Sequence, residues 1–128
     1  MKIEPDDWDV GLAKQLGIEF VEVGKERVIA KLLVRKELLT LTGTLHGGTL
    51  MAFADTIGAA GTVANLAEGQ NTATLESKTN FFAACRTGTV RAESTPLHRG
   101  KRTQVWQTRI TDEAGKLLSL TIQTQVIL

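Results

Sequence analysis

The most apolar stretch of the chain lies between His46 and Leu66, and its pattern is that of a buried helix. Apolar residues fall on nearly every face of a helix drawn through this stretch, and such a helix packs inside a protein rather than on its surface. Asp55 is the only ionisable residue in the stretch after His46. The pattern predicts one long buried helix from about Gly48 to Leu66 that carries a single carboxylate.

Most of the remaining chain alternates apolar and polar residues with the two-residue period of β-strands. Strands are expected at residues 18–23, 27–34, 72–82, 89–97, 103–111 and 117–128. Turns are expected at residues 24–26, 86–88, 98–102 and 112–115. A short helix capped by Asp6 or Asp7 should run through Leu16, with Gly17 ending it. The strand at 72–82 should have one polar face, formed by Thr74, Glu76, Lys78 and Asn80.

This order of elements predicts an α+β fold: a short helix, two strands, the long helix and four more strands. One helix can be buried on most sides only if an antiparallel sheet curls around it. The 128 residues are enough for a single domain with a real core, so we assign residues 1–128 to one domain. The exposed edges of such a sheet need cover, which favours self-association.

Composition narrows the class of protein. Charged residues make up 23% of the chain and the net charge is +1, which is too neutral for a general nucleic-acid binder. The single cysteine, Cys85, excludes an intramolecular disulfide and fits a cytoplasmic protein, as does the N-terminus without a hydrophobic signal region. Asp55, Asn65 and three threonines argue against a membrane span in the long helix.

Asp55 and Gly47 are the first candidates for chemistry. A lone carboxylate in an apolar helix costs several kcal/mol unless it is paired or neutralised, and Asn, Ala or Leu would cost less. Gly47 stands at the helix start, where free N–H groups can hold developing negative charge. The structural alternatives are a carboxylate that bonds a backbone group, and a tight turn before a helix.

The segment Gly43-Thr44-Leu45-His46-Gly47-Gly48, followed by Asp55 nine residues after His46, resembles a known family. It is similar to the hotdog-fold acyl-CoA thioesterases of the phenylacetate-pathway and 4-hydroxybenzoyl-CoA type. Residues 74–81 and 99–107 resemble the third and fifth strands of that family. The resemblance covers about residues 10–128.

The resemblance implies a curved sheet around the long helix and paired subunits with active sites at their interface, which pair again into tetramers. Asp55 of one subunit would face His46 and Gly47 of the other. Asp55 would be the general base or the nucleophile, and Gly47 would polarise the thioester carbonyl through its N–H. His46 would orient the loop and the substrate, although a histidine beside a helix start is more often structural.

Two threonines are further candidates. Thr74 matches a position at which the family often has Ser or Thr to hold the attacking water, but threonine is also simply a good strand residue. Thr40 lies six residues before His46, where relatives commonly carry Gln or Asn. A hydroxyl reaches less far than an amide, so this departure weakens the assignment of water positioning to Thr40.

The resemblance places the coenzyme A phosphates near two segments. One is the densest basic cluster of the chain, at residues 98–103, and the other is residues 82–84, at the end of the predicted strand at 72–82. The alternative for the basic cluster is a solvated hairpin tip. The candidate residues are His98, Arg99, Gly100, Lys101, Arg102 and Thr103, together with Phe82, Ala83 and Ala84.

The sequence therefore predicts a cytoplasmic, oligomeric thioesterase that hydrolyses an acyl-CoA to the free acid and coenzyme A, without a metal or bound cofactor. An aryl-acyl group is a slight favourite over a fatty one. One rival is a hotdog hydratase or dehydratase, which the nine-residue spacing disfavours. The other is a non-catalytic acyl-CoA binding module, which would carry a DNA-binding extension. Two histidines and one cysteine give no metal set, and Cys85 lacks a histidine at a recognisable spacing.

Overall fold

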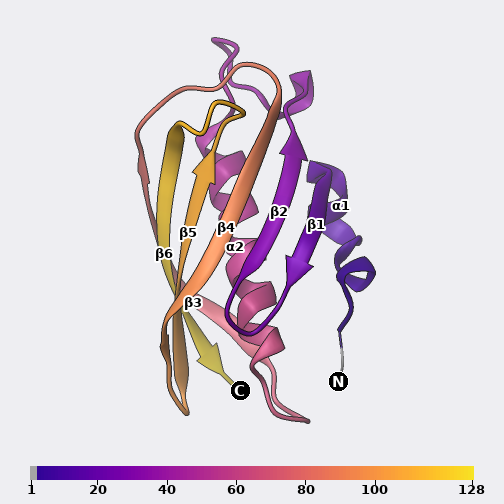
Figure 1. Ribbon diagram of the computed structural model, residues 1–128, viewed down its shortest axis with the longest axis vertical. Helices are drawn as coiled ribbons and strands as arrows, with labels where there is room; N and C mark the ends of the chain where they lie inside the picture. Colours follow the sequence, from indigo (N-terminus) through magenta and orange to yellow (C-terminus); the bar gives the residue numbers. More distant parts are fainter. Residues whose placement is uncertain (1–2) are drawn as a thin grey trace.

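A single curved sheet and one long helix make up most of the molecule (Figure 1). The computed structural model describes residues 3–128. The helical elements are η1 (Pro5–Trp8), α1 (Gly11–Leu16), η2 (Lys36–Leu38) and α2 (Gly47–Ala64). The strands are β1 (Ile18–Val23), β2 (Val28–Leu33), β3 (Thr72–Phe81), β4 (Thr89–Arg99), β5 (Thr103–Thr111) and β6 (Leu117–Ile127).

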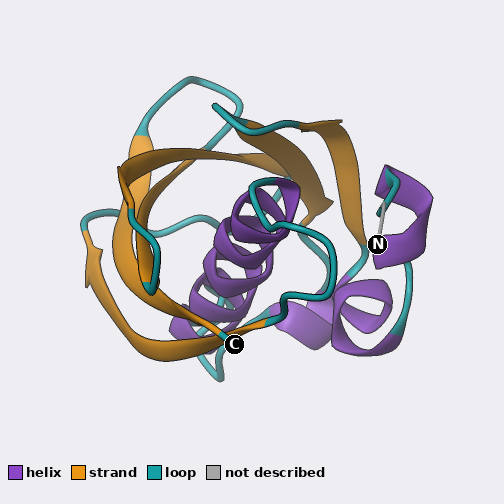
Figure 2. Cartoon of the chain, turned by 90° about the horizontal axis from the view of Figure 1, so that it is seen from below, coloured by secondary structure: helices purple, strands orange, loops and turns teal. Residues whose placement is uncertain are grey.

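The six strands form one antiparallel sheet in the order β1-β2-β4-β5-β6-β3. The sheet curls around α2, as the view along the helix shows (Figure 2). Phe53, Ile57 and Ala60 on α2 are completely buried. The expected α+β fold, with a curved antiparallel sheet wrapped around one long helix, is confirmed.

Small residues on α2 allow the sheet to approach closely. A Cβ at Gly61 would lie 2.5 Å from the ring of Trp106 on β5, and a Cβ at Gly58 would lie 2.3 Å from the side chain of Gln123 on β6. Both partners are fully buried. The glycines in the helix therefore determine which large side chains of the sheet can lie beneath it.

The helix is not buried on all sides, which corrects the sequence-based expectation for an isolated chain. Met51 is 37% exposed, and other residues on the same face of α2 are only half-buried: Ala52, Asp55, Thr56, Ala59 and Val63. We call these six residues the open stripe of α2. The stripe remains open because the sheet has two separate edges, β1 and β3, and does not close around the helix.

Three further expectations need correction. The expected first helix is two pieces, η1 and α1, and Val10 rather than an aspartate precedes α1 without a side-chain cap. Gly17 does end α1, with a left-handed φ of 78°. The alternation in β3 is broken by a register shift between Thr74 and Glu76. β4 continues through Arg99, because its pairing with β5 resumes after a bulge, so the basic turn contains only residues 100–102.

Within residues 3–128, no helix has both the length and the apolar character needed to cross a membrane.

Candidate active site

Asp55 lies near the middle of α2, where hydrogen bonds from the sheet hold its carboxylate. Thr74 Oγ1 on β3 donates to Asp55 Oδ1 over 2.7 Å, and Gln123 Nε2 on β6 donates to the same oxygen over 3.1 Å. Gln125 Nε2 donates to Thr74 Oγ1 over 2.6 Å. The carboxylate that the sequence presents as isolated is therefore the end of a polar network in which Thr74 takes part.

Sequence reasoning missed the two glutamines of this network. They lie on a face of β6 that is polar and buried, whereas the more apolar face of the same strand is partly exposed. The buried residues are Ser119, Thr121, Gln123 and Gln125, and the others are Leu120, Ile122, Thr124 and Val126. The usual orientation of a strand is the reverse. The sequence did contain one signal: Gln123 and Gln125 are two residues apart and therefore share one face of the strand. Amides that are buried need hydrogen-bond partners, so such a pair can indicate a polar network.

His46 caps the start of α2. Its Nδ1 accepts a hydrogen bond of 2.7 Å from the Gly48 N–H, so a neutral ring carries its proton on Nε2. His46 is exposed, which leaves Nε2 accessible to a substrate. A Cβ at Gly48 would lie 2.9 Å from His46 Nδ1. The glycine at 48 therefore allows the ring to fold back over the helix end.

Gly47 begins α2 with an unused donor. Its N–H has no hydrogen-bond acceptor among residues 3–128, as expected for the first turn of a helix. The ring of Phe81 lies against this residue, since a Cβ at Gly47 would be 3.2 Å from it. An apolar hollow adjoins this helix end, lined by Thr40, Thr44, Leu45, Gly47, Leu50, Phe81, Phe82, Ala83 and Ala84.

Thr40 lies in that hollow but is committed to its own loop. Its hydroxyl is 3.1 Å from the hydroxyl of Thr42 and 3.0 Å from that of Thr44. Its backbone N–H donates to the Thr44 carbonyl over 2.7 Å. Within the described chain its side chain contacts neither His46 nor Asp55 through a hydrogen bond. The geometry favours a structural role for Thr40 in the turn that precedes α2.

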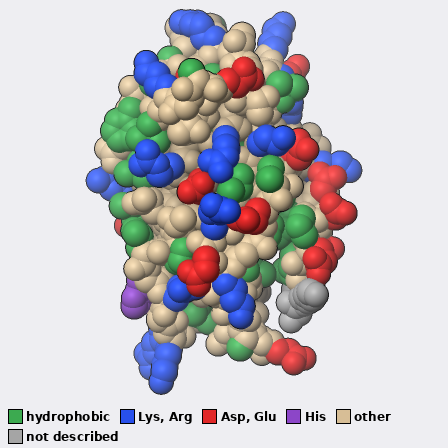
Figure 3. All heavy atoms as spheres, viewed as in Figure 1, with side chains coloured by type: hydrophobic (Ala, Val, Ile, Leu, Met, Phe, Trp, Pro, Cys, Tyr) green, Lys and Arg blue, Asp and Glu red, His purple; other side chains and the backbone are tan. Residues whose placement is uncertain are grey.

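The two segments expected near coenzyme A lie at opposite ends of α2. Phe82, Ala83 and Ala84 adjoin its start, whereas Arg99 bonds to Asn65, the residue that caps its end. The 18 residues of α2 make a helix about 27 Å long. Lys and Arg side chains gather at the lower end of the molecule, where β4 turns into β5 (Figure 3).

The members of the basic cluster differ in their surroundings. The Arg99 guanidinium donates to Glu26 Oε1 over 2.7 Å and to the Lys25 carbonyl over 3.2 Å. Lys101 and Arg102 are exposed and form no ion pair among residues 3–128. The positive charge available to a ligand is therefore concentrated on Lys101 and Arg102.

Two other features do not contribute to this site. Burial raises the pKa of the Cys85 thiol, which donates to the Thr87 carbonyl, so this cysteine is a poor nucleophile.

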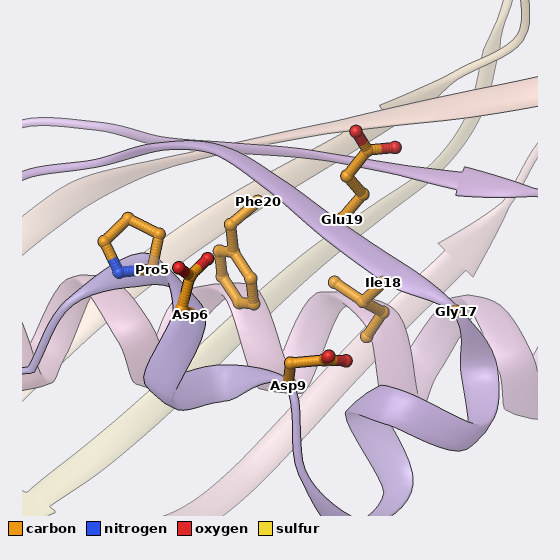
Figure 4. A pocket seen from close by; sticks show the side chains of 7 residues that line it. All are labelled: Pro5, Asp6, Asp9, Gly17, Ile18, Glu19 and Phe20. Atoms are coloured by element: carbon orange, nitrogen blue, oxygen red, sulfur yellow. The ribbon is translucent and has the colours of Figure 1, made fainter.

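A hollow between η1 and β1 contains Asp6, Asp9 and Glu19, whose carboxylates do not point to a common centre (Figure 4). Among residues 3–128, no group of three or more His, Cys, Asp and Glu side chains could hold a metal ion.

Comparisons with known proteins agree with the fold. The model of the thioesterase superfamily matches residues 42–119, more than half of the chain. The 1,4-dihydroxy-2-naphthoyl-CoA hydrolase of Listeria monocytogenes is 34% identical over 87% of this chain and 90% of its own. The enzyme of that name from Escherichia coli is 37% identical over 88% of this chain and 83% of its own.

A solved structure extends the match to the whole chain. The crystal structure of a thioesterase from Haemophilus influenzae superposes with a TM-score of 0.93 at 29% identity, covering 100% of this chain and 92% of that one. The sequence matches include both the helix start and Asp55. The chain belongs to the thioesterase superfamily and is a thioester hydrolase.

Proposed function

We propose that this enzyme hydrolyses acyl-CoA thioesters to the free acid and coenzyme A, with Asp55 as the acting carboxylate. The observation that carries the proposal is the Asp55 carboxylate, which is held by Thr74 and Gln123 at the open stripe of α2. The two relatives described above are named as hydrolases of a coenzyme A thioester. The exposed charges of Lys101 and Arg102 suit the phosphates of that coenzyme.

The active site forms between two subunits. Gly47 and Asp55 are separated by about 12 Å along one helix, too far to act on the same carbonyl group. A two-fold axis beside the open stripe of α2 brings Asp55 of each chain to Gly47 of the other. The small and apolar side chains of the stripe suit close packing, and the free edge of β3 can pair with its own copy.

The same arrangement connects the two coenzyme A segments. When Gly47 of one chain lies beside Asp55 of the other, the end of the second helix extends about 15 Å beyond the start of the first. The basic cluster of the second chain then lies beyond the hollow that contains Phe82 in the first. An extended coenzyme A can contact both, with its thioester at Gly47 and its phosphates at Lys101 and Arg102.

Dimers pair again through the outer face of the sheet. On β6 this face carries Leu120, Ile122 and Val126 and is partly exposed, with Ile122 38% exposed. Exposed apolar residues that cluster on a sheet favour burial against another surface. A second dimer is the occupant proposed here, which gives a homotetramer.

Hydrolysis uses groups already present in the chain. The Gly47 N–H and the positive end of α2 stabilise the negative charge that develops on the thioester oxygen. Asp55 either takes a proton from water, which attacks the carbonyl carbon, or attacks that carbon itself. In both routes the C–S bond breaks and the leaving sulfur takes a proton that comes from water; in the second route, water then hydrolyses the anhydride between Asp55 and the acyl group. No metal or bound cofactor is required.

An aryl-acyl group is the proposed class of substrate. The hollow beside Gly47 is lined by Phe81, Phe82, Leu45 and Leu50, and aromatic side chains pack favourably against an aromatic acyl group. Both hydrolase relatives are named for an aromatic acyl-CoA. The proposed order of preference is aryl-acyl over medium-chain fatty acyl thioesters.

Release of free thiol from a panel of aromatic and aliphatic acyl-CoAs tests the proposal. The expected result is thiol release that is fastest with an aryl-acyl-CoA and lost in Asp55→Asn. A hydratase would change an enoyl-CoA without releasing thiol. A binding module would bind acyl-CoA and release none, and either outcome would overturn the proposal.

A further inference from the structure

The two hydrogen bonds that hold Asp55 end on the same oxygen. Thr74 Oγ1 and Gln123 Nε2 both donate to Oδ1, over 2.7 and 3.1 Å. Oδ2 accepts no hydrogen bond from any side chain or backbone group of residues 3–128. The carboxylate is thus anchored through one oxygen, and the other is free to act at the open stripe of α2.

The direction of the hydrogen bonds follows from the carboxylate. An ionised Asp55 can only accept, so the hydroxyl hydrogen of Thr74 points to Oδ1. Thr74 Oγ1 then offers only lone pairs to Gln125, which must present its Nε2–H, over 2.6 Å. The Gln125 Oε1 is left facing Thr72, whose hydroxyl lies 3.0 Å away. Gln125 therefore fixes the orientation of Thr74, and Thr74 fixes Asp55.

The orientation in which Gln123 donates to Asp55 leaves its own carbonyl oxygen without a hydrogen bond. Its side chain is fully buried, and its Oε1 has no hydrogen-bond partner among residues 3–128. An unpaired buried acceptor is unfavourable, but turning the amide would place Oε1 against the Asp55 carboxylate. The space for this amide comes from Gly58, since a Cβ there would lie 2.3 Å from Oε1.

We propose that Gln123 and Gln125 are positioning residues: they hold Asp55 by Oδ1, directly and through Thr74, and so assign catalysis to Oδ2. This inference rests on the proposed function, in which Asp55 acts on the thioester. Neither glutamine touches the substrate. Their effect is to keep the free oxygen of the carboxylate directed away from β6 and towards the space where a partner chain presents Gly47.

No other charged group competes for Asp55 within the described chain. Asp55 is the only titratable residue of α2, and β6 carries none. On β3 the charged residues are Glu76 and Lys78, and both are exposed. Charged side chains of the other elements packed against α2 are exposed or paired on the surface. Within one chain, the groups that fix the position of the Asp55 carboxylate are therefore the hydrogen-bond donors at Oδ1.

The first test replaces each glutamine by a side chain of similar length that cannot donate. In Gln123→Met, kcat should fall about 10-fold, the size of one hydrogen bond to a charged group, while KM changes little. Gln125→Met removes the bond to the neutral Thr74 hydroxyl, and it should lower kcat in the same way, with KM again little changed. Thr108→Val is the matched control, because Thr108 is buried on β5 and donates to Ser94, away from Asp55.

The second test uses two glycines of one helix. Gly58→Ala should push the Gln123 amide away from Asp55 directly, whereas a Cβ at Gly61 would meet Trp106, the neighbour of Gln123 on β5, and reach the amide only indirectly. Both changes crowd the core to a similar extent. Per folded molecule, Gly58→Ala should lower kcat about 10-fold, and by more than Gly61→Ala does.

The outcomes separate this inference from the proposed function. If Asp55→Asn is inactive but the glutamine and Gly58 variants keep the parent kcat, the positioning role is wrong and the function stands. If Asp55→Asn remains fully active, the mechanism itself is wrong. Equal losses of kcat in Thr108→Val or Gly61→Ala would also overturn the positioning role, because general loosening of the core would explain them.

Discussion

Thr74 and Asp55 are joined by a hydrogen bond of 2.7 Å that links the edge strand β3 to the middle of α2. Because the hydroxyl hydrogen of Thr74 is committed to Asp55, Thr74 can interact with a water molecule only as an acceptor. The threonine therefore acts first on the carboxylate. This differs from the expectation that it chiefly holds the attacking water.

Replacing Thr74 by valine keeps its shape and removes this bond. We expect Thr74→Val to lower kcat about 10-fold, the size of one hydrogen bond to a charged group, while Thr74→Ser keeps most of the parent rate. Steady-state kinetics with one acyl-CoA provide the measurement. Parent-like kinetics in Thr74→Val would mean that the hydroxyl does not support Asp55.

Lys101 and Arg102 should act on binding rather than on chemistry. Lys101→Ala or Arg102→Ala should raise KM for acyl-CoA more than it lowers kcat, because contacts with remote phosphates stabilise ground and transition states alike. The increase should shrink with a short pantetheine thioester. Lys116→Ala is the control, since Lys116 is exposed in the hairpin at the other end of β5. Equal changes in KM with both substrates would mean that the two residues do not contact the phosphates and simply form a solvated turn.

Arg99 should behave differently from its neighbours, although it belongs to the same basic cluster. Its guanidinium already bonds to Glu26 and to the Lys25 carbonyl. This pair is exposed, so its contribution to stability is small. Arg99→Ala removes a guanidinium that is already paired, whereas Arg102→Ala removes one that is free to bind a phosphate. We therefore expect the larger increase in KM for acyl-CoA in Arg102→Ala.

The shared active site predicts complementation between two inactive chains. Asp55→Asn and Gly47→Val are each expected to be inactive alone. In a mixed dimer one site carries both defects and the other carries none, so random pairing should restore about a quarter of the parent activity. Co-refolding followed by a thiol-release assay provides the measurement. A fully active monomer in sedimentation would contradict a site built from two chains.

Cys85 should be dispensable for activity. Burial raises the pKa of its thiol above the ordinary value, so at neutral pH the thiol form dominates and the reactive thiolate is scarce. We expect slow labelling by a thiol reagent in the folded enzyme and rapid labelling after unfolding. Cys85→Ala should retain the parent rate of thioester hydrolysis. Loss of activity in a folded Cys85→Ala protein would reopen a nucleophilic role.

The sequence predicted the fold well because its two periodicities are clear. The apolar segment around Asp55 and the alternating strands led directly to a curved sheet around one helix. The buried face of β6 was not predicted, since alternation alone does not say which face points inward, and here the polar face with Gln123 and Gln125 is the buried one. The polar partners of Asp55 come from distant strands, so they become visible only when the strands are placed.

The expected positions of the candidate residues in the fold agree with the structure where they depended on local geometry. His46 and Gly47 stand at the start of α2, as their position before an apolar helix indicated. The extent of the basic turn was wrong, because pairing between β4 and β5 continues through Arg99. The ion pair between Arg99 and Glu26 could not be predicted from the sequence either, because the two residues belong to separate hairpins.

The most direct test of the mechanism is the rate of acyl-CoA hydrolysis by Asp55→Asn. Asparagine keeps the size of the side chain and an Oδ1 that can accept from Thr74 and Gln123, so the fold should survive and only Oδ2 is replaced. Thiol release should fall by about 10²-fold or more, the scale of a lost base or nucleophile, while a non-hydrolysable acyl-CoA analogue still binds. A folded Asp55→Asn enzyme that hydrolyses acyl-CoA near the parent rate would contradict the account and leave Asp55 a structural carboxylate.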